Sequence, residues 1–188
     1  RWSQLPGSPG DGATPQGAQE AAGPPLTANR TIGALGSIVA SRLAREFRLG
    51  GGTFAISCEE ASGMRALELG VRALQRGEMD AAVVGAVDLA GDARAVLASH
   101  LLRPYGSGAR PRPFEPEADG TLPGEGAVAL VLKRLADAQA HGDRVLAVID
   151  GLGAASGGGI DRPAADPGAY ASAVRRALED AGVPASEL

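Results

Sequence analysis

Short apolar runs alternate along the chain with amphipathic stretches, a pattern that favours an α/β protein. Three of these runs have no polar alternation and predict strands covered on both faces, as in a parallel sheet: Ala81–Val87, Ala127–Leu132 and Val145–Ile149. A shorter run, Thr53–Ile56, follows three glycines and predicts a strand that leads into a helix. We expect the three longer runs to lie in one mostly buried sheet.

The clearest helical pattern follows that short run, where Met64, Leu67, Val71 and Leu74 share one face. Asp166 as N-cap, Pro167 in the first turn and Gly182 at the end predict a last helix. Further helices are expected from Thr27 or Asn29 to Phe47, within Asp88–Ala98 and over Ala136–His141. Residues 1–26 are rich in glycine and proline and predict a linker ahead of a domain over residues 27–188.

Composition narrows the class of protein. The 188 residues are 44% hydrophobic but only 3% aromatic, which favours a layered core of small aliphatic side chains. A net charge of −4 provides no basic field for nucleic acid, and no run approaches the roughly 18 apolar residues that span a bilayer. The single cysteine excludes an internal disulfide. We expect a cytoplasmic protein that binds neither nucleic acid nor membrane.

The turn between the short strand and its helix is the first candidate site. It holds Ser57, Cys58, Glu59 and Glu60, and a helix N-terminus presents N–H groups that can bind a carboxylate, a thiolate or an oxyanion. The alternative is that these side chains only cap the helix. A dinucleotide site at Gly151-Leu152-Gly153 is disfavoured, because Ser156 stands where the motif needs its third glycine.

Two stretches resemble the β-ketoacyl synthases, or ketosynthases. The family's nucleophile turn, D-T-A-C-S-S, corresponds to Ser57–Ser62, and its later G-E-x-D corresponds to Gly77–Asp80. A second stretch matches the family's R-P-F, A-D-G and G-E-G motifs in order and spacing, followed by an apolar strand: Arg112-Pro113-Phe114, Ala118-Asp119-Gly120 and Gly124-Glu125-Gly126. The resemblance implies a thiolase-like layered α/β fold (αβαβα), present as a partial domain that matches the middle of a ketosynthase.

The same register implies an altered active site. It puts Glu60 at the position of the nucleophilic cysteine and leaves Cys58 two positions early, as either a small buried residue or a reactive thiol. The family's histidine motif H-G-T-G-T is absent. The resemblance therefore favours a non-condensing, chain-length-factor-like domain of a polyketide or polyunsaturated fatty-acid synthase that shapes an acyl pocket. A condensing enzyme that performs decarboxylative Claisen chemistry and a malonyl decarboxylase are the alternatives.

The supporting residues and partners are also implied by the resemblance. Phe114 would wall the acyl pocket, while Gly124 and Gly126 would let backbone approach a buried, paired Glu125. Acyl groups would arrive on the phosphopantetheine of an acyl carrier protein, with no resident cofactor or metal. The strand Thr53–Ser57 would pair across a homodimer, or across a heterodimer with another ketosynthase domain.

Overall fold

The computed structural model describes residues 27–33, 35–89, 93–102, 104–108, 110, 112, 115–157 and 166–187. This chain separates into two units, the first ending at Ile56 and the second beginning at Ser57. The predicted linker over residues 1–26 lies outside the described residues. The domain boundary at residue 27 therefore stays a prediction.

The described residues of the first unit form two helices where the sequence predicted one, namely α2 (Ala28–Gly33) and α3 (Ile38–Glu46). A turn separates them, in which the N–H of Ile38 donates to the carbonyl of Leu35 at 3.1 Å. The predicted strand Thr53–Ile56 is wrong, since this segment has no regular structure and pairs with no strand of the described chain. An extended segment needs a neighbouring backbone before it can form a ladder.

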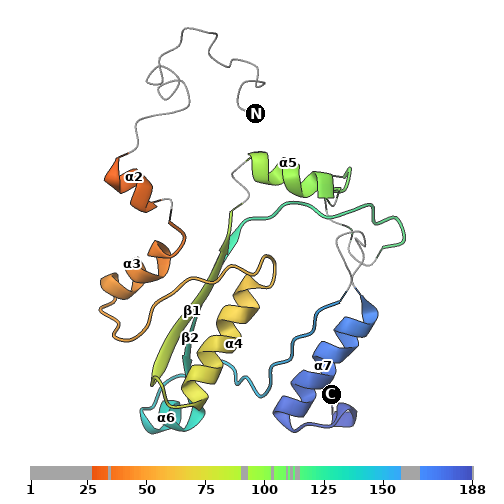
Figure 1. The fold of residues 1–188 in the computed structure, drawn as a ribbon. Coiled ribbons are helices and arrows are strands. Elements are labelled where there is room, and N and C mark those ends of the chain that lie inside the picture. Colours follow the sequence, from red (N-terminus) through yellow and green to blue (C-terminus); the bar gives the residue numbers. More distant parts are fainter. Residues whose placement is uncertain are drawn as a thin grey trace. The chain divides into compact units, whose positions relative to one another are not determined.

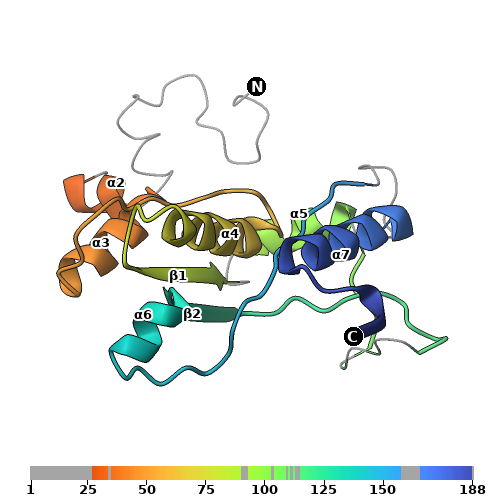
Figure 2. The ribbon, with the colours of Figure 1, turned by 90° about the horizontal axis from the view of Figure 1, so that it is seen from below.

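The second unit is built on two strands, β1 (Ala81–Asp88) and β2 (Gly126–Lys133), which confirm two of the three predicted runs. They pair antiparallel, with Ala81 opposite Lys133 and Asp88 opposite Gly126, so the expected parallel arrangement is wrong for this pair. Helix α4 (Ser62–Gln75) confirms the predicted amphipathic helix and lies along one face of the sheet (Figures 1 and 2). A Cβ atom at Gly70 would come within 2.7 Å of Val84, so the helix and the sheet approach closely.

The other face of this sheet is open in the described chain. Val83, Val87 and Val131 alternate away from α4 and remain 46%, 59% and 79% exposed. The expectation of a mostly buried sheet is therefore wrong for these residues, because α4 covers one face only. Within the described residues, only Ala44, Leu74 and Ala138 are buried.

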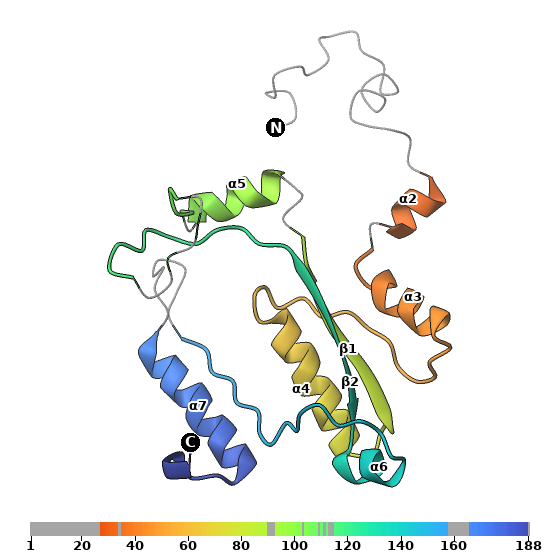
Figure 3. The same cartoon turned by 180° about the vertical axis from the view of Figure 1, so that it is seen from behind.

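The third predicted strand, Val145–Ile149, is also wrong, because this segment runs extended but joins no sheet of the described chain. It follows α6 (Leu135–Ala140) and leads to residues that lie along α7 (Pro167–Ala181), as Figure 3 shows. Asp166 caps α7 by accepting from the N–H of Gly168 at 2.8 Å. Helix α5 (Ala93–Leu102) and a short 3₁₀ turn, η2 (Ala185–Glu187), complete the described elements.

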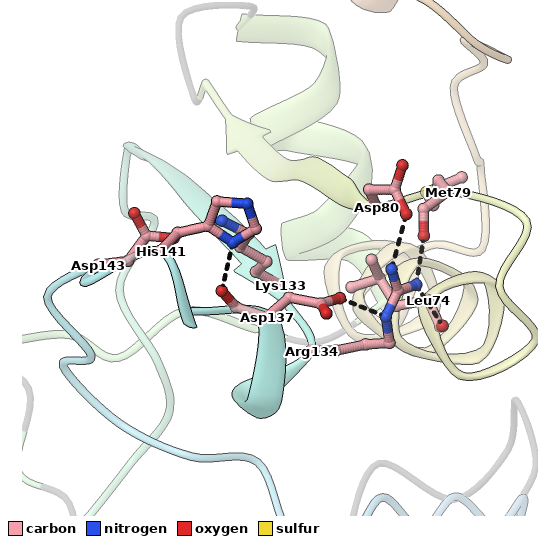
Figure 4. Close-up of polar contacts among 8 residues, drawn as sticks. All are labelled: Leu74, Met79, Asp80, Lys133, Arg134, Asp137, His141 and Asp143. Atoms are coloured by element: carbon pink, nitrogen blue, oxygen red, sulfur yellow. Dashed lines mark hydrogen bonds and ion pairs between the residues drawn. The ribbon is translucent and has the colours of Figure 1, made fainter. Parts of the chain in front are cut away.

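Arg134 joins three elements at the end of the sheet remote from the start of α4 (Figure 4). Its guanidinium donates to the carbonyls of Leu74 at 3.1 Å and Met79 at 2.7 Å, and it pairs with Asp80 at 2.7 Å. A further bond to Asp137 at 2.5 Å attaches α6. The carbonyl at the C-terminal end of α4 thereby gains a cationic donor, which suits the negative end of the helix dipole.

Candidate functional site

The turn before α4 is closed by the hydroxyl of Ser62. This oxygen accepts from the N–H of Cys58 at 2.8 Å and donates to the carbonyl of Glu59 at 2.6 Å. Glu59 has a φ of 49°, in the left-handed region that non-glycine residues seldom occupy. The chain therefore makes a sharp, hydroxyl-braced turn that presents Cys58, Glu59 and Glu60 at the surface. We call residues 57–62 the elbow.

The charge beside the elbow comes from Arg65, one turn into α4. Its pKa is raised chiefly by a hydrogen bond to Glu68 at 2.5 Å, with a smaller contribution from the Cys58 thiol. A guanidinium stays protonated and cannot act as a general base, so this neighbour cannot remove the proton of the thiol. Cys58 is exposed, which corrects the expectation of a small buried residue.

The chain has two histidines, and both rings interact away from the elbow. The Nδ1 of His100 accepts from the N–H of Tyr105 at 3.0 Å, and the two rings lie 5.6 Å apart. The ring of His141 contacts the carbonyl of Asp137 at 2.5 Å. In the described contacts, therefore, neither imidazole serves the elbow as an acid, a base or an oxyanion donor.

The segment between Pro104 and Thr121 is closed by Asp119. Its carboxylate accepts from the N–H of Ser107 at 2.9 Å and from the Ser107 hydroxyl at 2.5 Å, and it pairs with Arg112 at 3.3 Å. These hydrogen bonds, with that from the Ser107 hydroxyl largest, lower the pKa of Asp119 to about 2. The carbonyl of Thr121 accepts from Gly106 at 2.8 Å, so both ends of the segment lie together.

Gly120 is required at this closure. Its φ is 150°, and a Cβ there would come within 2.6 Å of the Gly106 nitrogen and 2.7 Å of the Pro104 carbonyl oxygen. In the A-D-G motif, Asp119 thus supplies the hydrogen-bond acceptor, and Gly120 directly after it has no side chain to block the closure. Phe114, the predicted pocket wall, lies outside the described residues, so its role stays a prediction.

The Gly124-Glu125-Gly126 motif lies at the same end of the sheet as the elbow. Gly126 pairs with Asp88 at the end of β1, and a Cβ at Gly63, just after the elbow, would come within 2.9 Å of Ala86. Glu125 is exposed and forms no ion pair or hydrogen bond within the described residues, so its role as a buried, paired carboxylate stays a prediction. A Cβ at Gly124 or Gly126 would meet nothing within 4 Å.

Sequence reasoning missed the two serines that organise these turns. Ser62 was seen only as part of the matched motif, and Ser107 was not singled out. The sequence does offer one local indication of the role of Ser107. A serine in the loop Gly106-Ser107-Gly108 can donate from its hydroxyl and from its backbone N–H to a nearby carboxylate.

None of the described helices has the length and apolar character needed to cross a membrane.

Comparison with known proteins gives a consistent result. The family described as β-ketoacyl synthase, N-terminal domain, matches residues 8–138. The hybrid PKS-NRPS synthetase TAS1 of Gloeophyllum trabeum is 37% identical over 154 residues, which make up 79% of this chain and 10% of that synthetase. The phthioceranic/hydroxyphthioceranic acid synthase of Mycobacterium bovis is 37% identical over 153 residues, covering 81% of this chain and 7% of that synthase.

Solved structures agree with the sequence matches. The oxazolomycin ketosynthase domain OzmH KS7 of Streptomyces albus superposes with a TM-score of 0.78 at 29% identity, covering 92% of this chain and 30% of that chain. A β-ketoacyl synthase from Burkholderia phymatum gives a TM-score of 0.76 at 28% identity, covering 86% of this chain and 40% of that one. The chain thus spans less than half of either solved structure and a tenth or less of the two synthases.

Proposed function

Because the chain belongs to the β-ketoacyl synthase family and has part of its thiolase-like α/β fold, we propose that it is a non-condensing ketosynthase-like region of a polyketide or fatty-acid synthase. In this proposal it acts as a chain-length-factor-like partner that shapes an acyl pocket. The observation that carries the proposal is Glu60, which occupies the position of the family's nucleophilic cysteine in the matched register. The whole synthase supplies the condensation.

The chemistry of the elbow supports this assignment. Acyl transfer from a thioester to a carboxylate would give a mixed anhydride, whereas transfer to a thiolate gives another thioester of similar energy. Cys58 is two positions from the nucleophile position, and misplacement by about 1 Å can already cost on the order of 100-fold in rate. Both imidazoles of the sequence have their described contacts away from the elbow.

The partners belong to the same proposal. One relative is by name a hybrid PKS-NRPS synthetase and another an acid synthase, and a domain that shapes an acyl pocket would receive acyl groups from the phosphopantetheine arm of an acyl carrier protein. The domain would dimerise, with itself or with a condensing ketosynthase domain, in the cytoplasm. It would use no cofactor or metal of its own.

The proposal is tested with an acyl thioester. The chain is incubated with an octanoyl thioester of N-acetylcysteamine, and intact mass and peptide mapping then locate any acyl group. We expect no stable acylation. In a Cys58→Ala background, Glu60→Cys should create a thiol that alkylates rapidly with iodoacetamide, because the N-terminus of α4 favours the thiolate, yet the variant should still not condense malonyl groups.

Opposite results would favour the alternatives. Acylation at Cys58 that is abolished by Cys58→Ala would overturn the non-condensing proposal and support a condensing enzyme with a rebuilt elbow. Release of CO₂ from a malonyl thioester, without chain extension, would support the decarboxylase. A positive test adds the chain to a condensing ketosynthase and an acyl carrier protein, where a shift in product length is expected and an unchanged product distribution would contradict a chain-length role.

A further inference from the structure

The last turn of α5 is joined to the segment that follows it through the ring of His100. The N–H of Tyr105 donates to Nδ1 of this ring at 3.0 Å, and the two aromatic rings lie 5.6 Å apart. Within the described residues, no other hydrogen bond connects α5 with the rest of the chain. His100 therefore fixes the point at which the Pro104–Thr121 segment leaves this helix.

The Nδ1 atom of His100 can accept this hydrogen bond only while it carries no proton. A neutral imidazole has one bare nitrogen, whereas both nitrogens of an imidazolium ion are donors. A histidine side chain ordinarily gains its proton between about pH 5 and 8. Protonation of His100 sets one N–H group against that of Tyr105, so the hydrogen bond between them cannot survive it.

The ring of His100 has no charged partner in the described part of the chain. His100 is exposed and forms no ion pair there. In the segment that follows, Asp119 pairs with Arg112 at 3.3 Å. The other described charged residues of that segment are exposed and form no hydrogen bond or ion pair with the ring: Arg110, Glu115 and Glu117. Along α5 itself, the other charged residue is Arg94, six positions earlier.

His141 shows the opposite arrangement at the C-terminal end of α6 (Figure 4). Nδ1 of its ring lies 2.5 Å from the carbonyl oxygen of Asp137. Because a carbonyl oxygen only accepts, this Nδ1 carries a proton whether the ring is neutral or charged. A second proton at Nε2 leaves the contact intact and suits the negative end of the helix dipole. The two histidines of the chain therefore differ, since acid breaks the contact of His100 and keeps that of His141.

We propose that His100 is a pH-sensitive link, which joins α5 to Tyr105 while its ring is neutral and releases Tyr105 when the ring is protonated. The joined arrangement binds one proton fewer than the released one, so acid favours release and a rising pH favours joining. Release also suits the negative end of α5, toward which a cationic ring can turn. The link lies outside the elbow and needs no acyl group.

The release is confined to the junction with α5. The pKa of Asp119 is about 2, so its carboxylate stays ionised throughout the range in which a histidine gains its proton. Gly106 also remains bonded to the carbonyl of Thr121, at 2.8 Å, through groups that do not titrate. Acid therefore frees the start of the Pro104–Thr121 segment from the helix without opening the segment itself.

Hydrogen exchange of the Tyr105 N–H tests the proposal. The full chain is labelled with ¹⁵N, and NMR follows the protection factor of this amide, which corrects for the intrinsic effect of pH, from about pH 8 to about pH 5. In the wild type it should fall about three- to tenfold, the equilibrium weight of one hydrogen bond. His100→Asn keeps an acceptor oxygen near the position of Nδ1 but does not titrate, so its protection factor should stay constant. His100→Phe removes the acceptor and should lower the protection at every pH.

His141→Asn is the matched control, because it removes the other titrating ring and should leave the fall at Tyr105 unchanged. The amides of α4 report on the rest of the second unit, and their protection factors should stay constant over the same range. A constant protection factor at Tyr105 in the wild type would overturn the proposal. A fall that persists in His100→Asn, or a parallel fall throughout α4, would also overturn it.

The tautomers of the two rings give a second and direct measurement. At about pH 8, the imidazole ¹⁵N shifts should show a bare Nδ1 in His100 and a protonated Nδ1 in His141. The His100 signals should move to the doubly protonated form over the same pH range in which the Tyr105 amide loses protection. A protonated Nδ1 in the neutral ring of His100 would exclude the bond from Tyr105, and with it the link.

Discussion

Two serine hydroxyls close the turns on which the candidate site depends. Ser62 joins Cys58 and Glu59 at the elbow, and Ser107 binds Asp119 at the start of the Pro104–Thr121 segment. In each case a short side chain satisfies backbone or carboxylate groups that regular secondary structure leaves unpaired. A single hydroxyl group therefore contributes to the geometry of each turn, together with backbone N–H groups and, at Asp119, with Arg112.

The titration of Asp119 tests this view. Its pKa is about 2, below the ordinary 3.8, so the native contacts favour the carboxylate. The stabilisation is fully present above the ordinary value and is lost as the pH falls through about 2. Ser107→Ala should raise this pKa toward 3.8 but not fully, because the N–H of Ser107 and the guanidinium of Arg112 still contact the carboxylate. Carboxyl ¹³C NMR across an acid titration measures the change.

Ser186→Ala is the matched control, because it removes a hydroxyl from the 3₁₀ turn near the C-terminal end and should leave the Asp119 titration unchanged. An identical Asp119 midpoint in Ser107→Ala and in the wild type would show that the hydroxyl bond is not the main cause. Equal shifts in both variants would indicate a general change of the fold instead.

At the level of single residues, the sequence predicted which residues lie at the turn before α4, but it did not predict how exposed they are. The predicted sharp turn between the short run and the amphipathic helix formed at the elbow, because the turn and helix signals are local, whereas the assignment of Glu60 to the nucleophile position stays a prediction. The burial of Cys58 and Glu125 could not be predicted, because burial depends on which layers cover a residue. The Ser107–Asp119 contact joins residues twelve positions apart in a loop, where no hydrophobic periodicity reports on structure.

At the level of elements, amphipathic helices were predicted and strands only in part. Helices α4 and α7 formed as expected, because their apolar spacing and end signals are local. Val145–Ile149 has the composition of a strand but no partner in the described chain, and pairing is what distinguishes a strand from an extended segment. No motif or periodicity singles out Arg134, because its bonds to Leu74 and Met79 depend on the folded arrangement.

Gly151 and Gly153 have a packing role that the sequence pattern did not reveal. A Cβ at Gly151 would overlap the carbonyl oxygen of Ala177, and one at Gly153 would overlap that of Ala173. The extended segment therefore lies directly on the backbone of α7, at a row of alanines spaced four apart: Ala169, Ala173, Ala177 and Ala181. Packing against α7 therefore explains why residues 151 and 153 are glycines, without a dinucleotide-binding motif.

Gly153→Ala should destabilise the second unit by about 1–3 kcal/mol, because the added methyl group forces the segment away from α7. Urea unfolding followed by circular dichroism measures the change in the free energy of unfolding. Gly124→Ala is the matched control, since its Cβ would meet nothing within 4 Å and its φ lies outside the left-handed region. A Gly153→Ala variant as stable as this control would show that the segment does not pack on α7 in solution.

At the level of the whole second unit, few apolar side chains support the arrangement, so polar links between distant elements matter. Leu74 and Ala138 are its buried apolar residues in the described chain, while many larger side chains stay exposed. Asp180 on α7 accepts from the N–H of Leu152 at 2.9 Å and from Arg72 on α4 at 2.9 Å. One carboxylate thereby joins α4, α7 and the extended segment, which are far apart in sequence.

A double-mutant cycle at Arg72 and Asp180 tests this link. Amide hydrogen exchange of α7 should increase in Arg72→Ala and increase more in Asp180→Ala, which also releases the N–H of Leu152. The double variant should exchange no faster than Asp180→Ala, because both substitutions remove the same bond. Arg175→Ala, on the exposed surface of α7, should leave the exchange unchanged.

The pH dependence of amide exchange in α7 gives an independent check of the bond between Arg72 and Asp180. The pKa of Asp180 is lowered, first by the Leu152 N–H and then by Arg72, so the wild-type contact persists at neutral pH and is lost as the pH falls below the ordinary 3.8. The difference in α7 exchange between the wild type and Asp180→Ala should therefore disappear in strong acid. Additive effects in the cycle, or a difference that survives below the Asp180 titration, would show that α7 is held by packing alone.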